Sequence, residues 1–291
     1  MPRLFPRLLA LSAVLAFAPM ERPARGAEPA RLVVPSYDRN DRPQEAYFHE
    51  LLDLALQKTV ARDGPYHIKT DPRRMSIARS IDEVQRQGAV NIVWLAHHAE
   101  RDRALSPVRV DLLGELNNYR VLMIRRGDQA RFDNIGSADD LRRMTAGMGQ
   151  QWAVTKIMRQ RGFPIVAALT NASLFRMLEM KRFDYCPRGL YEAWHEVALP
   201  ENSALAIEDK LLLYLDAPFY FYVNKHNTAL AGRLERGLQA AQADGSLGLL
   251  QSRYFKRALD ELRSNKRKLI VLSGQAGSVA PDAVPGAPPY K

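Results

Sequence analysis

The sequence predicts an α/β fold in which strands and helices alternate in two successive rounds. Short apolar runs of the kind that form buried strands recur along the chain, for example NIVWLA at 91–96 and YRVLMI at 119–124. Segments with apolar residues at helical spacing lie between these runs. With 291 residues, 46% hydrophobic and 25% charged, the chain is long enough for one large or two modest cores.

The first hundred residues predict the order β-α-β-α-β. The expected elements are a strand at 31–37, a helix whose apolar face holds Tyr47, Phe48, Leu51, Leu52 and Ala55, a strand at 66–70, a helix at 76–86 and a strand at 91–96.

A second round starts at the strand 119–124. It continues with a helix at 138–143 capped by Ser137, a strand at 145–149, a helix at 151–160, a strand at 165–169, a helix at 173–181, a strand at 184–186 that stops at Pro187, strands at 211–214 and 219–223, a helix at 230–241 and a helical turn at 248–256.

The two ends of the chain carry signals that are not those of a folded core. Arg3 and Arg7 precede an apolar run at 8–18, and small residues at 24 and 26 suit a cleavage site. Residues 1–26 are therefore interpreted as a signal peptide, and export to the periplasm of a Gram-negative bacterium is expected. Residues 273–291 are rich in Gly, Ala and Pro and predict a disordered tail.

The charge of the chain is basic but dispersed. The formal net charge is +10, of which residues 1–26 contribute +3 (four arginines less one glutamate). The basic residues do not form a stripe with a reading motif, so no nucleic-acid partner is predicted. A small anionic ligand or an anionic surface is the better interpretation. Cys186 is the single cysteine, and its neighbours favour a small buried residue over a nucleophile.

Three landmarks carry a resemblance to a known family. AER at 99–101 follows the third strand, GMGQQ at 147–151 follows the Asp-Leu pair at 140–141, and ADGS at 243–246 is followed by Tyr254 and Phe255. In this pattern, over about 30–270, the chain resembles the type II periplasmic solute-binding proteins, in particular the amino-acid receptors of ABC importers.

The resemblance implies a two-lobed fold, each lobe a mainly parallel sheet flanked by helices. Lobe 1 would comprise 27–120 plus 215–272 and lobe 2 would comprise 121–214, with hinge strands near 118–121 and 214–219. Such a monomer closes around a small-molecule ligand and delivers it to a membrane permease. Regulation of a membrane signalling protein by the same closing cleft is the alternative.

The resemblance also implies ligand-binding residues. Arg101 would pair with a ligand carboxylate, a contact that gives both energy and orientation; the alternative is a solvated arginine. Gln150 and Gln151 would begin a helix whose N–H groups suit an anion. Trp152 either stacks on the ligand or fills the lobe core. Tyr37 ends the first strand, where relatives place a ligand-facing residue.

Arg188 departs from the amino-acid receptors. Those proteins usually carry an aspartate for the ligand ammonium at this place, whereas a cation would repel an ammonium and attract an anionic group. The sequence therefore predicts an anionic ligand that is not an ordinary α-amino acid, unless Glu192 compensates. The alternative for Arg188 is a surface pair with Glu192 at i, i+4.

No chemistry beyond binding is predicted. Trp94 joins the candidate ligand-binding residues on the third strand, while the adjacent His97 and His98 point to opposite faces and cannot chelate one metal. No Gly-x-Ser-x-Gly elbow occurs. A peptidoglycan lyase on this scaffold would need a further helical domain after Leu272. We therefore expect no cofactor, no metal and no catalysis.

Overall fold

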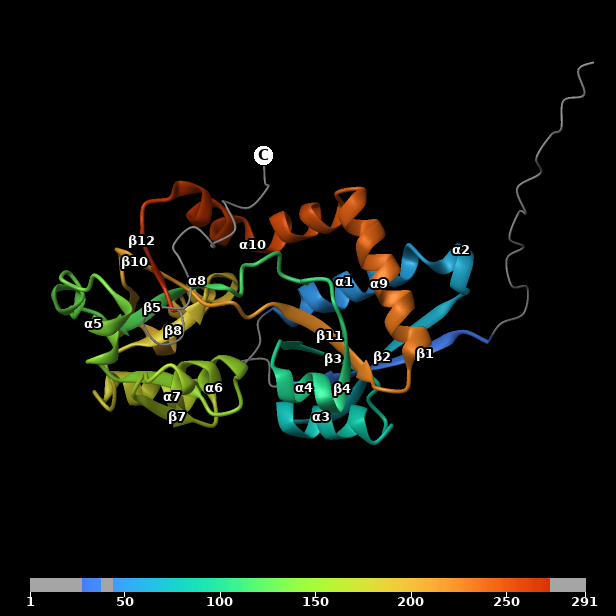
Figure 1. The fold of residues 1–291 in the computed structure, drawn as a ribbon, viewed down its shortest axis with the longest axis horizontal. Helices are drawn as coiled ribbons and strands as arrows, with labels where there is room; N and C mark the ends of the chain where they lie inside the picture. The colour runs from blue at the N-terminus through green and yellow to red at the C-terminus, as the bar shows by residue number, and fades with distance from the viewer. Residues whose placement is uncertain (1–27, 38–43, 273–291) are drawn as a thin grey trace, which may run out of the picture.

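The computed structural model describes residues 28–37 and 44–272, and its elements form two lobes that lie side by side (Figure 1). The predicted signal peptide and the predicted C-terminal tail lie outside the described residues. Within the described residues, no helix is both long and apolar enough to cross a membrane.

The first lobe is built on five strands in two adjoining sheets. These are β1 (Ala30–Ser36) paired in parallel with β2 (Tyr66–Arg74), and β11 (Phe219–Asn224) lying antiparallel between β3 (Ile92–Ala96) and β4 (Leu105–Val108). Asn91 joins the two sheets: its N–H donates to Val33 O at 3.0 Å, and its side-chain oxygen accepts from Val33 N at 2.9 Å.

Helices cover both faces of these strands. They are α1 (Glu45–Gln57), α2 (Val60–Asp63), α3 (Ile77–Gln85), α4 (Ala99–Ala104), α9 (Thr228–Ala243) and α10 (Ser246–Ser264). The predicted apolar face of α1 is confirmed, since all five of its residues are buried. Ser76 accepts a hydrogen bond from Arg79 N and fixes the start of α3.

The second lobe carries a five-stranded sheet and a two-stranded sheet. The larger has the order β12 (Lys268–Val271), β10 (Leu211–Tyr214), β5 (Tyr119–Arg125) and β8 (Cys186–Gly189), with β9 (Leu205–Ile207) also on β5, and the smaller pairs β6 (Ala146–Gly149) with β7 (Ile165–Ala168). The helices are α5 (Ala138–Arg142), α6 (Ala153–Gln160), α7 (Asn171–Glu179) and α8 (Leu190–Val197), with short 3-10 turns at Gln129–Arg131 and Pro200–Asn202.

The predicted α/β, two-lobed fold class is confirmed, with one difference inside the sheets. β1/β2, β6/β7 and β10/β12 are parallel as expected. β5 and β11 run antiparallel to the neighbours with which they pair within their lobes. Each of these two strands follows a segment that passes between the lobes, and each runs opposite to the strands beside it in its sheet.

Two local predictions were wrong. Pro187 lies inside β8 and does not end it, because β8 lies at the end of the strand order, where a missing N–H breaks no ladder. The helix expected from residue 151 begins at Ala153, after a turn. The short elements α2, α4, β4, α8, β9 and β12 were not predicted.

The C-terminal segment was also misplaced. Residues 268–272 were expected in lobe 1, but β12 pairs in parallel with β10, and Ile270 and Leu272 are buried in the core of the second lobe. The chain therefore crosses between the lobes a third time, after α10. The two predicted crossings are hydrogen-bonded to each other, with Asn118 accepting from Leu215 N and Ala217 N at 2.9 Å. That these two segments act as hinges stays a prediction.

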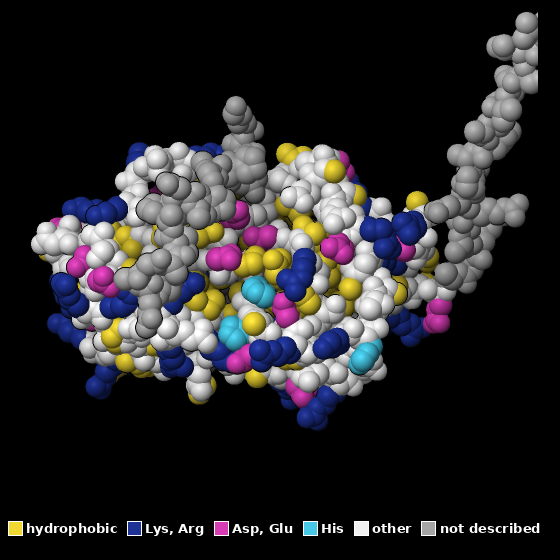
Figure 2. All heavy atoms as spheres, viewed as in Figure 1, with side chains coloured by type: hydrophobic (Ala, Val, Ile, Leu, Met, Phe, Trp, Pro, Cys, Tyr) yellow, Lys and Arg dark blue, Asp and Glu magenta, His cyan; other side chains and the backbone are white. Residues whose placement is uncertain are grey.

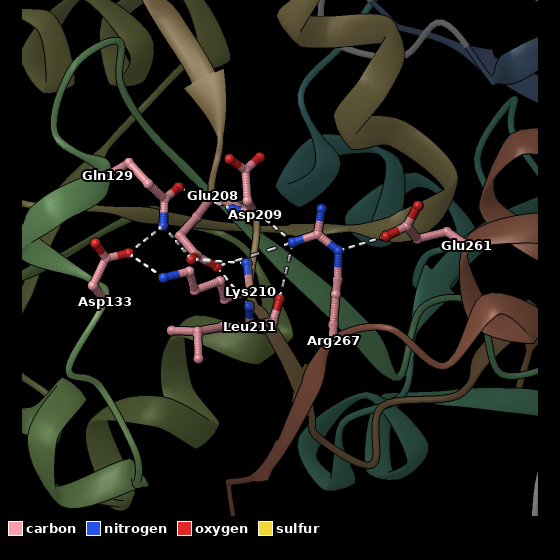
Figure 3. A network of polar contacts seen from close by, with 8 residues as sticks. All are labelled: Gln129, Asp133, Glu208, Asp209, Lys210, Leu211, Glu261 and Arg267. Atoms are coloured by element: carbon pink, nitrogen blue, oxygen red, sulfur yellow. Dashed lines mark hydrogen bonds and ion pairs between the residues drawn. The ribbon is translucent and has the colours of Figure 1, made fainter.

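Arg267 holds the third crossing in place (Figure 3). Its Nε donates to Glu261 Oε1 of α10 at 2.6 Å, and its Nη1 donates to the backbone oxygens of Glu208 and Leu211 in the second lobe. The fully buried Glu208 carboxylate accepts from Gln129 Nε2 and from two backbone N–H groups at 2.7–2.9 Å. The network ties the end of a first-lobe helix to a second-lobe loop.

Candidate functional site

A cavity of about 480 Å³ lies between the two lobes. The first lobe contributes the ends of β1, β2 and β3 and the start of α1, whereas the second lobe contributes the turn after β6, the starts of α6 and α7, and residues of β8 and α8. The charged and polar side chains on its wall are Tyr37, Gln44, Glu45, Arg74, Ser76, Arg101, Asn117, Arg120, Gln150, Gln151, Thr170, Asn171, Arg188, Tyr191 and Glu192.

Seven of the eight predicted ligand-binding residues line this cavity. They are Tyr37, Arg101, Gln150, Gln151, Trp152, Arg188 and Glu192. These residues are far apart in the sequence, and the two lobes bring them to one wall. Whether they contact a ligand stays a prediction.

Trp94 is the exception. Its side chain is fully buried, its ring stacks on that of Phe48 with centroids 5.6 Å apart, and its Nε1 donates to Glu45 Oε1 at 3.3 Å. Successive side chains on a strand point to opposite faces, and the next residue, Leu95, is the one on the cavity wall. Trp94 therefore packs in the core behind Phe48 and does not reach the cavity.

Arg101 lies where the lobes meet. Its Nη1 donates to Ala96 O in the first lobe, and its Nη2 lies 3.4 Å from Gln151 O in the second. The side chain of Gln151 accepts from Ala78 N at 3.3 Å, again across the lobes. A Lys156–Glu100 ion pair adds a third contact. These contacts hold the two lobes together beside the cavity.

Gln150 and Gln151 form the turn between β6 and α6, so the predicted helix N-terminus at these residues is absent. Trp152 is the N-cap residue of α6, lines the cavity and packs against the second-lobe core, so its predicted packing is confirmed and its stacking on a ligand stays a prediction. Its ring lies directly on Gly149, where a Cβ would stand 2.3 Å from the ring.

Substitution of Gly149 by alanine is therefore expected to displace the Trp152 ring and to destabilise the fold by about 1–3 kcal/mol, as overpacking typically does. Near-ultraviolet circular dichroism and urea unfolding would detect the two effects. Gly248 in α10 is the matched control, because a Cβ there meets no atom within 4 Å. Alanine at 248 should leave the tryptophan signal unchanged and stabilise the helix by about 0.5–1 kcal/mol. Equal behaviour of the two variants would contradict the close packing at Gly149.

Arg188 is buried and neutralised by two carboxylates. Its Nε lies 2.7 Å from Glu196 Oε2, and its Nη2 lies 3.0 Å from Glu192 Oε2. Its guanidinium carbon stands 4.3 Å from the centroid of the Trp152 ring. The alternative pairing with Glu192 is present, but it does not lie at the surface, because the Arg188 side chain is only 3% exposed.

The electrostatics of Arg188 follow from this pairing. Burial by itself would lower the pKa of the guanidinium, but the charges of Glu192 and Glu196 outweigh it and raise that pKa above its ordinary value. Two negative charges face one positive charge, so Arg188 has little attraction left for an anionic ligand. Glu192 also accepts from Gly189 N at 3.1 Å and so caps α8.

Arg120 is one of several cavity residues that the sequence analysis missed. It stands near the start of β5, is 3% exposed, and its Nη2 donates to Asn117 O and Oδ1 at 3.2 and 3.0 Å. Burial lowers the pKa of its guanidinium. The sequence feature that could have identified Arg120 is its position as a lone arginine inside the apolar run YRVLMI, because an arginine in a buried strand needs a polar partner.

Counted over its described residues, the wall carries more positive than negative charge. Four arginines (74, 101, 120 and 188) and two glutamates (45 and 192) line it. Phe48, Tyr191, Phe219 and Trp152 supply an aromatic surface between them. An anionic or polar ligand with an apolar part fits this lining better than a cation does.

The described residues hold no group of three His, Cys, Asp or Glu placed to bind a metal ion. His97 Nδ1 lies 3.4 Å from Asp102 Oδ1, while the His98 ring caps α4 by accepting from Glu100 N. Cys186 is fully buried, as predicted, and burial raises the pKa of its thiol to about 12. It is therefore unsuited to act as a nucleophile at neutral pH.

Two α/β lobes that enclose a cavity lined from both sides define a bilobal architecture. The fold is that of the type II periplasmic binding proteins, so the resemblance seen in the sequence is confirmed at the level of the fold. No family model and no curated protein matches the sequence.

The chain is similar in structure to an ancestral arginine-binding protein bound to arginine, with 17% identity over 78% of this chain and 98% of that one and a TM-score of 0.58. It is likewise similar to the amino acid ABC transporter substrate-binding protein AbpA of Streptococcus pneumoniae bound to L-arginine. The identity is 17% over 79% of this chain and 96% of that one, and the TM-score is 0.58. A third similar structure is a histidine kinase sensor domain, with 15% identity over 77% of this chain and 96% of that one and a TM-score of 0.57.

Proposed function

We propose that the protein is a periplasmic solute-binding protein that closes on a small polar, anionic ligand and delivers it to a membrane importer. The observation that carries this proposal is the cavity between the lobes, whose wall holds four arginines and two glutamates. The proposed action is binding without catalysis, by a monomer.

The physical basis of the proposed function is closure. A ligand shifts the population toward the closed form only by the difference between its affinities for the closed and the open form. A molecule in this cavity would touch both lobes at once, and contacts such as that of Arg101 with Gln151 form only when the lobes meet. Ligand binding and lobe closure are therefore expected to be coupled.

The surface supports a small-molecule partner over a nucleic acid. On the face shown in Figure 2, Lys and Arg side chains are dispersed among Asp and Glu and form no continuous stripe. Many arginines are held in ion pairs with nearby carboxylates, for example Arg131 with Asp184 at 2.6 Å. Counter-ion release from a nucleic acid would need a continuous basic track.

A thermal-shift screen of amino acids, dicarboxylates, sugar acids and small peptides tests the proposal. A ligand at one hundred times its Kd should stabilise the protein by about 2.7 kcal/mol. Arg101→Ala is expected to weaken binding by about 10- to 100-fold, the value of a charge-assisted hydrogen bond. Arg103, exposed on the same helix and off the cavity wall, is the matched control. Equal calorimetric affinities of the two variants would remove Arg101 from the site.

A sensor role is the second candidate, because one of the similar structures is a histidine kinase sensor domain. Both functions use the same closing cleft, so the discriminating measurement is made in cells. If deletion of the gene abolishes uptake of the labelled ligand, delivery to an importer is supported. If uptake is intact and only the ligand-dependent transcriptional response is lost, the sensor role replaces it.

A further inference from the structure

We infer that Arg120, together with Arg101, binds the anionic group of the ligand, and that this ligand is a carboxylic acid without an ammonium group beside the carboxylate. The inference rests on the proposed function and specifies its ligand class. It assigns to Arg120 the role that the sequence suggested for Arg188.

The starting point is a comparison of the four buried arginines among the described residues. Arg125 has an aspartate and two backbone carbonyl oxygens as partners. Arg188 has two glutamates. Arg233 donates to a threonine hydroxyl and to two backbone carbonyl oxygens. Each of these three guanidinium groups uses at least two of its nitrogens.

Arg120 has fewer partners than the other three. Only its Nη2 donates, and both acceptors belong to one residue, Asn117. Its Nε is buried without a hydrogen-bond partner. The carboxylate that acts most on its charge, Glu192, forms its ion pair with Arg188 and not with Arg120. The Nε of Arg125 is also unpartnered, and Arg233 likewise has no described carboxylate within ion-pair distance, so Arg120 is distinguished by having all its hydrogen bonds on a single nitrogen.

A buried cation without a counter-ion is costly, and a polar group with unused donors adds to that cost. Arg120 stands on the wall of the cavity, where a ligand can supply what the protein lacks. A carboxylate offers two oxygens in the plane of the guanidinium and so matches its paired donors. The carboxylate would become the missing counter-ion.

The acidic side chains of the wall already have partners. Glu192 accepts from Gly189 N and is paired with Arg188. Glu45 accepts from Trp94 Nε1. An ammonium beside the bound carboxylate would lie close to Arg120 and would have to displace one of these contacts. The wall therefore favours an acid that carries a carbonyl, hydroxyl or hydrogen where an amino acid carries its ammonium, with the remainder against Phe48 and Tyr191.

The test uses matched pairs of ligands that differ only at this position. These are phenylpyruvate and L-phenylalanine, 4-methyl-2-oxopentanoate and L-leucine, and 2-oxoglutarate and L-glutamate, titrated by calorimetry into the full-length protein. Within each pair that binds, the oxo acid is expected to bind at least about tenfold more tightly, the discrimination that one unfavourable charge contact produces.

The variants separate a binding role of Arg120 from a structural one. Arg120→Met should weaken binding of the oxo acid about 100-fold while the melting temperature without ligand stays the same or rises, because a costly charge is removed. Arg125→Met is the matched control on the same strand: it loses an ion pair, so its melting temperature should fall while its affinity is retained.

Each outcome has a distinct meaning. If none of the ligands in these pairs or in the wider screen stabilises the wild-type protein, the proposed function fails and the inference fails with it. If a ligand binds but Arg120→Met retains its affinity, only the inference is overturned. Tighter binding of the amino acid within a pair overturns the ligand class. A melting temperature of Arg120→Met as low as that of Arg125→Met shows that Arg120 is structural.

Discussion

Replacement of Arg188 by methionine is expected to lower the free energy of unfolding by about 3–5 kcal/mol, because it leaves two carboxylates in the interior without their cation. The side chains of Glu192 and Glu196 are only 12% and 2% exposed. Equilibrium unfolding in urea measures the loss, provided that the slope with denaturant is unchanged.

The double variant Arg188→Met/Glu196→Gln is expected to recover part of this loss, since it removes one of the stranded charges. Arg143, 80% exposed in its side chain, is the control, and its replacement should change stability by less than about 0.5 kcal/mol. A loss below about 1 kcal/mol at Arg188 would show that these carboxylates are better solvated than their burial indicates.

The pH dependence of the Arg188→Met variant has a definite sign. Without the arginine, burial raises the pKa of the Glu196 carboxyl in the folded state above its unfolded value. The folded state then binds the extra proton first, so the stability deficit should shrink as the pH falls toward the unfolded pKa. The wild-type protein, in which Arg188 pairs with both glutamates, should not show this gain.

Replacement of Trp94 by alanine is expected to cost about 3–5 kcal/mol, the usual range for a large aromatic side chain removed from a core. The indole is fully buried, stacks on Phe48 and meets the rings of Tyr37 and Phe221 edge-on. Ligand affinity of the folded variant should change little, because Trp94 does not line the cavity.

Trp152 provides the comparison for Trp94, since it lines the cavity and stacks on Arg188. Alanine at 152 should reduce ligand affinity more and stability less than alanine at 94. Urea unfolding and calorimetry on both variants give the two quantities. A greater loss of affinity at Trp94 than at Trp152 would return Trp94 to the binding site and contradict its assignment to the core.

Local sequence patterns were sufficient for the order of the long elements. The apolar face of α1, the cap at Ser137 and the strand β5 were predicted because each depends on neighbours within a few residues. The strand β12 was missed, because four residues carry little periodicity and its partner β10 lies more than fifty residues earlier. Its assignment to the first lobe was wrong for the same reason.

The candidate site, like the fold, could be predicted from the sequence only in part. The family landmarks led to Arg101 and to the turn 150–152, all of which line the cavity. The charge balance at Arg188 could not be foreseen, because Glu196 lies on a helix whose position relative to β8 is set by packing. The burial of Arg120 depends on how the two lobes meet.

The sequence by itself determined the alternation of strands and helices and the basic character of the chain, because these follow from local periodicity and composition. Its resemblance to a family pointed to residues that line the cavity. Only the tertiary structure decided which arginine has a counter-ion. Arg188 is buried against two glutamates and Arg120 against a single asparagine, and this difference arises from contacts between strand, helix and crossing segment. The expected anionic ligand is retained as a proposal, with Arg120 in the role that the sequence suggested for Arg188.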